Sequence, residues 1–291
     1  MELKEESEIS MKNYFLKTIY GVSNRITARH FVKALHSYLV PIDYTRTQEI
    51  PVLLDESGII NKKNEKIRIL DVGSPQILSL TLGVINTEWE IIYINPFIDE
   101  VDDLREKTTL LGIINIKTLQ EDIKNIGLAD KIGTFDYIFS CSVFEHIHPE
   151  DGGDKYASLN LKSLLNDGGI CAISVPYYKK AFNEYKEKSV YFIENKGNEK
   201  IFFQRFYDAR TIDENIISPS CLEVVSRCFI GERYYYPRSI EKRLGLYFSI
   251  SKVRYVLGRF FSILSKIFMK YSNESTSLRK PYLAFIFLRK P

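Results

Sequence analysis

The feature that most constrains the fold is a regular alternation between short runs of apolar, β-branched residues and segments with helical spacing. The predicted strands of this part of the chain are residues 67–72, 89–94, 113–118, 135–140 and 170–175. A helix is predicted over residues 102–111, and another over 159–165 that ends at the turn Asp167-Gly168-Gly169. Buried strands that alternate with helices form parallel sheets covered on both faces. The sequence therefore predicts an α/β fold with a doubly wound, mostly parallel, seven-stranded sheet.

Two additional segments accompany this core in the predicted domain organisation. Residues 11–40 place apolar side chains at helical spacing, which predicts a helical N-terminal cap over residues 1–64. Residues 65–230 and 281–291 are expected to form the α/β domain. Residues 231–280 are expected to form a basic, amphipathic helical insertion before the last strand.

The later part of the α/β domain has less regular patterns. From Pro176 to Lys200 the chain is rich in aromatic and charged residues without a single period, which suits an insertion on the substrate side. A helix is predicted over residues 206–215. Strands predicted over residues 222–230 and 282–288 would close the sheet as an antiparallel pair.

Composition and charge exclude several classes of protein. The 40 Lys and Arg residues nearly balance the 37 Asp and Glu residues, and the net charge of +3 gives no whole-chain argument for a nucleic-acid partner. The four cysteines lack the paired spacing of a zinc site and the density of a secreted disulfide scaffold. No signal-peptide pattern opens the chain, and no apolar run reaches the roughly 20 residues of a membrane span. We therefore expect a cytoplasmic protein.

The segment from Glu232 to Lys270 is the most polarised part of the chain. It contains nine basic and two acidic residues, and aromatic and aliphatic residues lie between them. Such a mixture is typical of basic helices on an anionic bilayer surface, which would make the protein peripheral on the inner face of a membrane. A solvated face on helices whose apolar side packs on the domain explains the same pattern. Both interpretations remain open.

A carboxylate and a glycine follow the first predicted strand, in the run Ile69-Leu70-Asp71-Val72-Gly73. They would lie at the carboxyl edge of the sheet, where doubly wound folds bind their ligands. Gly73 would let the backbone approach a ligand closely, and Asp71 could orient a turn amide or a water molecule. One Asp-x-Gly after a strand is common, so the prediction depends on the motifs that follow.

Three segments together resemble the class I S-adenosylmethionine-dependent methyltransferases, of the type 11-like kind, over roughly residues 65–290. The first is residues 69–74, the second is residues 135–146, which end in Glu145-His146, and the third is the helix, turn and strand of residues 161–175. The resemblance implies a Rossmann-like fold and S-adenosylmethionine as cofactor. The sequence departs from the family pattern at Ser74-Pro75-Gln76, where further glycines are usual, and at Asn95, where an acidic residue is usual.

The same resemblance implies the residues that would bind the cofactor. Asp71, Gly73 and Ser74, with Ser140 and Cys141 after the fourth strand, would hold the methionine end, and Arg46 would pair with its carboxylate. Asn95 would bind the ribose, with Asp99 as the alternative. Asp122 and Ile123 would bind the adenine. These cofactor-binding positions are Arg46, Asp71, Gly73, Ser74, Asn95, Asp122, Ile123, Ser140 and Cys141.

Methyl transfer is an in-line displacement, so the protein has to align donor and acceptor and, for a hydroxyl acceptor, remove a proton. An imidazole with a reference pKa near 6.5 suits that step, and His146 with the neighbouring Glu145 is the predicted catalytic pair. A capping or packing histidine is the alternative. His148, Tyr177 and Tyr178 would contact the acceptor, where stacking on a sugar competes with ordinary loop packing.

The expected acceptor is polar, such as a saccharide or a lipid-linked glycan, while small metabolites and lipids stay open. No metal is expected, because Glu145, His146 and Asp151 cannot converge from neighbouring positions. One alternative is a nucleotide-cofactor oxidoreductase, although the Gly-x-Gly-x-x-Gly turn is absent and Pro75 removes an amide. The other is a methyltransferase-like binding module without catalysis, which the missing glycines and Asn95 would permit.

Overall fold

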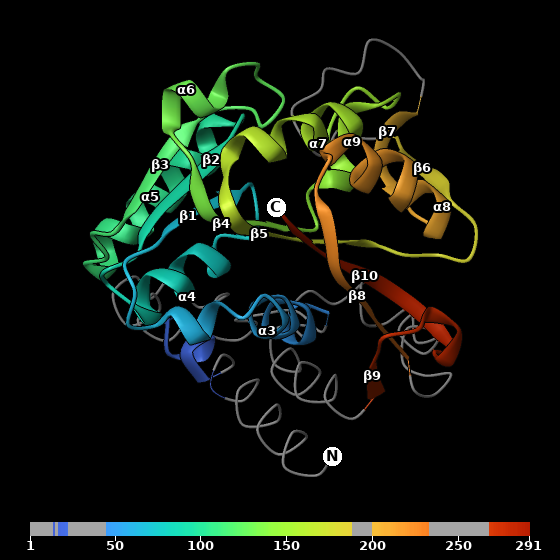
Figure 1. The fold of residues 1–291 in the computed structure, drawn as a ribbon, viewed down its shortest axis with the longest axis horizontal. Coiled ribbons are helices and arrows are strands. Elements are labelled where there is room, and N and C mark those ends of the chain that lie inside the picture. The colour runs from blue at the N-terminus through green and yellow to red at the C-terminus, as the bar shows by residue number, and fades with distance from the viewer. Residues whose placement is uncertain (1–13, 15–16, 23–44, 188–199, 233–267) are drawn as a thin grey trace.

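The protein is described here by a computed structural model that covers Tyr14 and residues 17–22, 45–187, 200–232 and 268–291. Its strands are β1 (Arg68–Val72), β2 (Glu90–Asn95), β3 (Ile116–Gln120), β4 (Phe135–Cys141), β5 (Leu165–Pro176), β6 (Phe182–Lys186), β7 (Ile201–Phe206), β8 (Glu223–Glu232), β9 (Met269–Ser272) and β10 (Lys280–Arg289). The main sheet has eight strands in the order β3-β2-β1-β4-β5-β10-β8-β9 (Figure 1). β1 to β5 run parallel, whereas β10 is antiparallel to both β5 and β8. The predicted doubly wound, mostly parallel α/β fold is confirmed.

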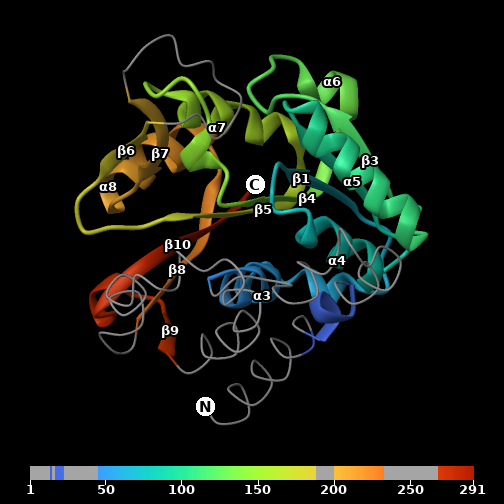
Figure 2. The same ribbon diagram turned by 180° about the vertical axis from the view of Figure 1, so that it is seen from behind.

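Helices cover both faces of this sheet (Figures 1 and 2). They are α3 (Arg46–Glu56), α4 (Ile77–Ile85), α5 (Ile98–Leu111), α6 (Leu128–Ile132), α7 (Gly153–Leu164), α8 (Ala209–Ile212) and α9 (Ser218–Ser220). Side chains of α3, α4 and α5 belong to the hydrophobic cluster on one face, and those of α6, α7 and α8 to the cluster on the other. The sheet therefore has two separate hydrophobic layers, as a parallel sheet with buried faces requires.

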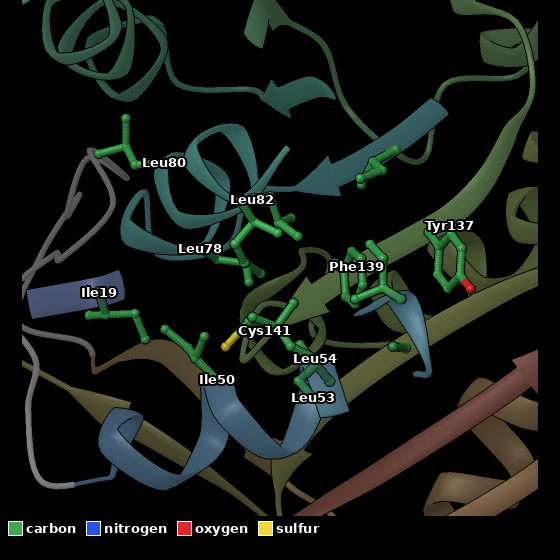
Figure 3. Close-up of a cluster of buried hydrophobic side chains, with 14 of the residues drawn as sticks. Ile19, Ile50, Leu53, Leu54, Leu78, Leu80, Leu82, Tyr137, Phe139 and Cys141 are labelled. Carbon is green, nitrogen blue, oxygen red and sulfur yellow. The ribbon is translucent and has the colours of Figure 1, made fainter. Parts of the chain in front are cut away.

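The layer beneath α3 and α4 fixes the N-terminal part of the chain on the sheet. Leu78 and Leu82 of α4 gather with Ile50 and Leu53 of α3 and with Phe139 of β4 (Figure 3), and all five side chains are fully buried. Full burial of one such side chain stabilises the fold by about 1.5–3 kcal/mol. This packing holds the first turn of α3 above the carboxyl ends of β4 and β5, where α3 contacts both strands.

A separate antiparallel hairpin of β6 and β7 lies beside α7 and α8 (Figures 1 and 2). β6 lies in the segment from Pro176 to Lys200 that is predicted as a substrate-side insertion, and β7 follows that segment; its residues 188–199 lie outside the described residues. The helix predicted over residues 206–215 begins later, at Ala209. Asp208 caps it: its side chain accepts from the Thr211 amide, and its own amide donates to the Thr211 hydroxyl. A π-helical turn then spans Asp213–Ile217.

The chain around the predicted basic insertion differs from the expectation where it is described. β8 continues to Glu232, and residues 269–272 form β9 on its outer edge rather than a helix. β9 is the eighth strand of a sheet predicted with seven. Residues 233–267, which hold eight of the nine basic residues of the segment, lie outside the described residues. The helical cap predicted for residues 1–64 contains α3 and the helical residues 17–22.

Candidate active site

The turn after β1 is built around Gly73. Its φ of +60° lies in the left-handed region that favours glycine, and its amide donates to the Ile94 carbonyl at 2.8 Å. A Cβ at this position would stand 3.4 Å from Val143 and 3.6 Å from the Asn95 amide nitrogen. The missing side chain therefore leaves space between this turn, the end of β2 and the chain after β4.

Asp71 and Ser74 stabilise this turn from inside the protein. Asp71 is fully buried, and its Oδ2 accepts a hydrogen bond from the Ser79 hydroxyl of α4. Burial raises the pKa of Asp71 to about 6, and the polar groups of Ser74 and Ser79 oppose that rise. The Ser74 hydroxyl accepts from the Cys141 amide at 2.9 Å, which ties the turn to the end of β4. Oδ1 of Asp71 has no hydrogen-bond partner among the described residues. Asp71 therefore supports the turn from a buried position and keeps one oxygen without a partner.

Asn95, at the end of β2, is 8% exposed and is already hydrogen-bonded within the protein. Its Oδ1 accepts from the Phe97 amide at 2.9 Å, and its Nδ2 donates to the Tyr93 hydroxyl at 3.0 Å. A primary amide has two N–H groups and two acceptor lone pairs, so one donor and one acceptor remain for a further partner. The side chain keeps enough capacity for a ribose hydroxyl.

Asp122 and Ile123 follow β3 and form polar contacts with neighbouring segments. Asp122 accepts from the Lys124 amide at 2.9 Å and lies 3.4 Å from the Lys124 ammonium group. Lys124 also donates to the carbonyl of His148 in the loop after β4. Ile123 is buried, and its carbonyl accepts from Asn160 of α7 at 2.7 Å. The loops after β3 and β4 are thereby joined at the same edge of the sheet.

Ser140 and Cys141, which end β4, are both fully buried. The Ser140 hydroxyl oxygen has no hydrogen-bond partner among the described residues. Burial raises the pKa of the Cys141 thiol well above its ordinary value, and Nη1 of Arg46 lies 3.6 Å from its sulfur. Cys141 is therefore a neutral thiol at neutral pH.

The first turn of α3 places an ion pair over the ends of β4 and β5. Glu49 is fully buried and pairs with Arg46, which the sequence had suggested as a ligand for a carboxylate. Oε1 of Glu49 accepts from the hydroxyls of Ser142 at 2.6 Å and Ser174 at 2.7 Å. Sequence analysis missed both Glu49 and Ser174. The one available signal was an acidic residue on the otherwise apolar stripe of a helix.

Ser142, the first residue after β4, has a φ of 51°, which is uncommon for a residue other than glycine. Its amide donates to the carbonyl of Ser174 at 3.0 Å and lies 3.2 Å from the Ser174 hydroxyl. Backbone in this region persists where surrounding contacts over-determine it, and it concentrates at functional sites. The contacts from Glu49 and Ser174 supply that constraint here.

Glu145 and His146 lie side by side in a 3₁₀ turn, Phe144–His146. Burial raises the pKa of Glu145 to about 8, and its Oε2 has no hydrogen-bond partner among the described residues. His146 Nδ1 is 2.7 Å from the Phe203 carbonyl, so Nδ1 carries the proton and Nε2 carries the lone pair. Nε2 is 3.9 Å from Glu145 Oε1. Burial lowers the pKa of His146 to about 4, so the imidazole is neutral at neutral pH.

Arg205 of β7 holds the loop that carries this pair, and sequence analysis missed it. Its guanidinium donates to the carbonyls of Ile147 at 2.9 Å, Pro149 at 2.6 Å and Glu150 at 2.7 Å. Its Nε lies 3.6 Å from Asp154 of α7, and the arginine side chain is only 6% exposed. A fork of donors that satisfies several loop carbonyls makes Arg205 a positioning residue for Glu145 and His146.

The three residues predicted to contact the acceptor lie in different environments. Tyr177 is 7% exposed and packs edge-on against Phe229, whereas Tyr178 is 46% exposed. The His148 ring lies edge-on to Phe202, and its Nε2 is buried without a hydrogen-bond partner among the described residues. Burial, with Arg205 and Lys124 nearby, lowers the pKa of His148. Tyr178 is accessible to an acceptor, and Tyr177 belongs to the core.

Two further properties concern the described part of the chain alone. None of its helices is both long and apolar enough to cross a membrane. It contains no group of three or more His, Cys, Asp and Glu side chains that could hold a metal ion.

Comparisons with known proteins identify structures with a similar fold. The sequence matches no protein-family profile and no curated protein. The structure is similar to coclaurine N-methyltransferase bound to N-methylheliamine and S-adenosylhomocysteine, with a TM-score of 0.53 and 12% identity over 97% of this chain and 95% of that one. It is also similar to an S-adenosylmethionine-dependent methyltransferase from Clostridium acetobutylicum, with a TM-score of 0.51 and 11% identity over 85% of this chain and 92% of that one. The structure is similar as well to the MccD protein, with a TM-score of 0.54 and 14% identity over 86% of this chain and 99% of that one. Likeness at these identities establishes the fold alone, so the chain shares the doubly wound α/β fold of these proteins, two of which are methyltransferases.

Proposed function

We propose that the protein is an S-adenosylmethionine-dependent methyltransferase whose site lies at the carboxyl ends of β1, β2, β4 and β5. The observation that carries this proposal is the left-handed turn at Gly73, which faces Asn95 and Val143 without a side chain of its own. The turn stands between β1 and β4, where the strand order of the sheet reverses and doubly wound folds bind ligands. The fold shared with two methyltransferases supports the same activity.

The residues around the turn fit this cofactor. Gly73 and Ser74 offer a close backbone approach, the unpartnered Ser140 hydroxyl is available to a polar group, and Arg46 can meet a carboxylate. Asn95, Asp122 and Ile123 would bind the adenosine part, while the buried Asp71 and Cys141 would support the turn after β1 and the end of β4. When bound, the cofactor supplies an electrophilic methyl group. The acceptor would then approach from the side of Glu145 and His146.

We assign proton removal from a hydroxyl acceptor to His146. Its Nε2 carries a lone pair, and the neutral imidazole can take up the proton as the new bond forms. Glu145 is protonated at neutral pH and can donate a hydrogen bond to the acceptor through its unpartnered side. A neutral base beside the site supports O-methylation of a polar acceptor, for which we propose a saccharide or a lipid-linked glycan, with His148 and Tyr178 nearest to the acceptor.

Two separate variants test the cofactor site: Gly73→Ala alters it, and Gly112→Ala is the matched control. Both glycines have a positive φ, 60° and 65°, so each alanine costs about 1–2 kcal/mol of backbone strain. A Cβ at Gly112 would meet nothing within 4 Å, whereas one at Gly73 would stand between the turn, Asn95 and Val143. Calorimetry with S-adenosylhomocysteine should show at least about tenfold weaker binding for Gly73→Ala alone. Equal affinities in the two variants, or no binding by the unaltered protein, would overturn the assignment.

Turnover is measured on the same preparations with methyl-labelled S-adenosylmethionine and a panel of hydroxyl and amine acceptors. Transfer to a hydroxyl that is lost in His146→Ala but retained in Gly112→Ala supports the assignment of the base. Transfer to amines alone would contradict O-methylation while leaving the cofactor site standing.

A methyltransferase-like binding module without catalysis is the second candidate. It is favoured by the engagement of both Asn95 and Arg46 with partners inside the protein. Tight binding of S-adenosylhomocysteine without transfer to any acceptor would support this alternative.

A cytoplasmic location and a contact between residues 232–270 and an anionic membrane surface complete the proposal. Almost all of that segment lies outside the described residues, so the membrane contact rests on its sequence. Cosedimentation with anionic vesicles should fall when its basic side chains are replaced, and unchanged cosedimentation would dismiss the contact.

A further inference from the structure

A lysine ammonium group and the proposed base lie against the same aromatic ring. Nζ of Lys186, in β6, is 3.0 Å from the ring centre of Phe203 in β7. The imidazole of His146 packs on that ring with centroids 5.0 Å apart, and its Nδ1 is 2.7 Å from the Phe203 carbonyl. The His146 side chain is 19% exposed, and Lys186 is half-buried. A small ligand can therefore reach both groups.

The ammonium group of Lys186 has no acidic partner among the described residues. Its printed neighbour is the ring of Phe203, which attracts the cation but accepts none of the strong hydrogen bonds that three N–H groups can donate. Glu184, two positions earlier in β6, accepts instead from Gln204 across the hairpin. Lys186 therefore keeps both its charge and its donors for an anion.

The charges around His146 are not balanced within the described part of the chain. Three cations each lower the pKa of this histidine: Arg46, Lys186 and Arg205. The two arginines have carboxylate partners, since Arg46 pairs with Glu49 and Arg205 with Asp154. The lysine is the member of this group whose charge no described carboxylate neutralises.

Proton uptake by His146 would place a second positive charge near Lys186. The adjacent carboxyl group, Glu145, has its Oε1 3.9 Å from Nε2 of His146 but is protonated at neutral pH, because burial raises its pKa to about 8. A nearby cation disfavours the protonated imidazole and so weakens the base. An acceptor that brings its own negative charge would offset Lys186 and favour proton uptake.

We propose that Lys186 binds an oxyanion group of the acceptor, a phosphate or a carboxylate, and thereby places the reacting hydroxyl beside His146. Lys186 would then be the residue that selects an anionic acceptor over a neutral one. The assignment of this anion as part of the methyl acceptor rests on the proposed function. Binding of an oxyanion beside Lys186 does not.

The binding test follows the ring resonances of His146 by NMR at neutral pH while inorganic phosphate or acetate is added at constant ionic strength. The resonances of His146 are identified by their absence in His146→Gln. Arg46 also attracts anions, so each titration is repeated with saturating S-adenosylhomocysteine, whose carboxylate would occupy Arg46. The two anions distinguish a phosphate site from a carboxylate site.

Three variants accompany the unaltered protein in these titrations. Lys186→Gln removes the charge, and Lys186→Arg restores it. Lys162→Gln is the matched control, because Lys162 is exposed and has no ion pair among the described residues. It lies in the last turn of α7, just before β5 begins, at the edge of the sheet opposite the proposed site.

We expect phosphate to shift the His146 resonances to saturation, with and without S-adenosylhomocysteine. Lys186→Gln should bind phosphate at least about tenfold more weakly, because a hydrogen bond to a charged group is lost. Lys186→Arg and Lys162→Gln should bind it as the unaltered protein does. The spectra also show whether each variant is folded. Saturation by acetate as well would extend the site to carboxylates.

The absence of a saturable shift, an equal affinity in Lys186→Gln, or a shift that S-adenosylhomocysteine abolishes would overturn the anion site. In turnover assays with matched acceptors, such as glucose and glucose 6-phosphate, a higher kcat/KM for the neutral member would overturn the selection of anions. Phosphate binding without S-adenosylhomocysteine binding would support the anion site and refute the proposed function. S-adenosylhomocysteine binding without phosphate binding would do the reverse.

Discussion

Replacing Glu49 with Gln tests whether Arg46 is shared between the protein and the cofactor. Arg46 forms an ion pair with Glu49, whose side chain is fully buried while that of Arg46 is 24% exposed. Glu49 would therefore compete with the cofactor carboxylate for the same guanidinium. Glu49→Gln removes the competing charge and keeps a side-chain oxygen that can accept from the hydroxyls of Ser142 and Ser174.

The expected changes in cofactor affinity follow from the strength of a charged hydrogen bond and from the exposure of Arg46. A hydrogen bond to a charged group contributes about 1.5–3 kcal/mol, so Arg46→Ala should weaken S-adenosylhomocysteine binding by roughly 10- to 150-fold. Glu49→Gln should act in the opposite direction. The gain should stay within about tenfold, because water reaches a quarter of the Arg46 side chain and weakens the competition that the substitution removes.

Calorimetry with two ligands separates this effect from general damage. S-adenosylhomocysteine carries the amino-carboxyl end, and 5′-methylthioadenosine has the same nucleoside without it. Arg46→Ala and Glu49→Gln should change the affinity for the first ligand and leave that for the second unchanged. Ser174→Ala is the matched control, since it removes one hydrogen bond to Glu49 and leaves the ion pair intact. Equal changes for both ligands, or weaker binding by a folded Glu49→Gln protein, would refute the role of Arg46.

Two further predictions concern stability. Burial raises the pKa of Glu145 from 4.5 to about 8, so the folded state retains a proton that the unfolded state has lost, and stability should fall by on the order of 2 kcal/mol from pH 6.5 to 8. Urea unfolding at both pH values should show this loss in the unaltered protein and not in Glu145→Gln; an equal loss in the variant would exclude burial of Glu145 as the cause. Arg205→Met should destabilise the protein by about 3–5 kcal/mol, because it leaves Asp154 without its cation and the carbonyls of Ile147 and Glu150 without their donor. Arg205→Lys should recover only part of that loss, and a cost below about 1 kcal/mol for Arg205→Met in urea unfolding would show that the loop is held without it.

The parallel part of the sheet could be predicted because its strands are buried on both faces. Ile91, Ile92 and Ile94 of β2 are all buried, and such continuous apolar runs are visible in the sequence. The β6–β7 hairpin gives no comparable signal, because its aromatic residues lie on a partly exposed surface. Its position depends on the contacts of Arg205 with a loop more than fifty residues earlier in the chain. No local pattern carries that information.

The candidate site divides in the same way between local and long-range determinants. Gly73 could be predicted because a tight turn at a positive φ needs glycine. Glu49 could not, because its partners Ser142 and Ser174 are 93 and 125 positions away. Tyr177 and Tyr178 show a related limit. Consecutive residues of an extended chain face opposite sides, and the sequence does not tell which one faces the core.

Burial changes the chemistry of Glu145 and His146 in a way that their sequence does not show. Neighbouring carboxylate and imidazole groups would form an ion pair in water near pH 6, whereas here burial raises one pKa to about 8 and lowers the other to about 4. The pair is therefore uncharged at neutral pH. In the proposed reaction, His146 gains a positive charge when it accepts the acceptor's proton, and the donor loses one when its methyl group leaves. The step therefore moves one positive charge from the sulfur of the donor to the imidazole of His146.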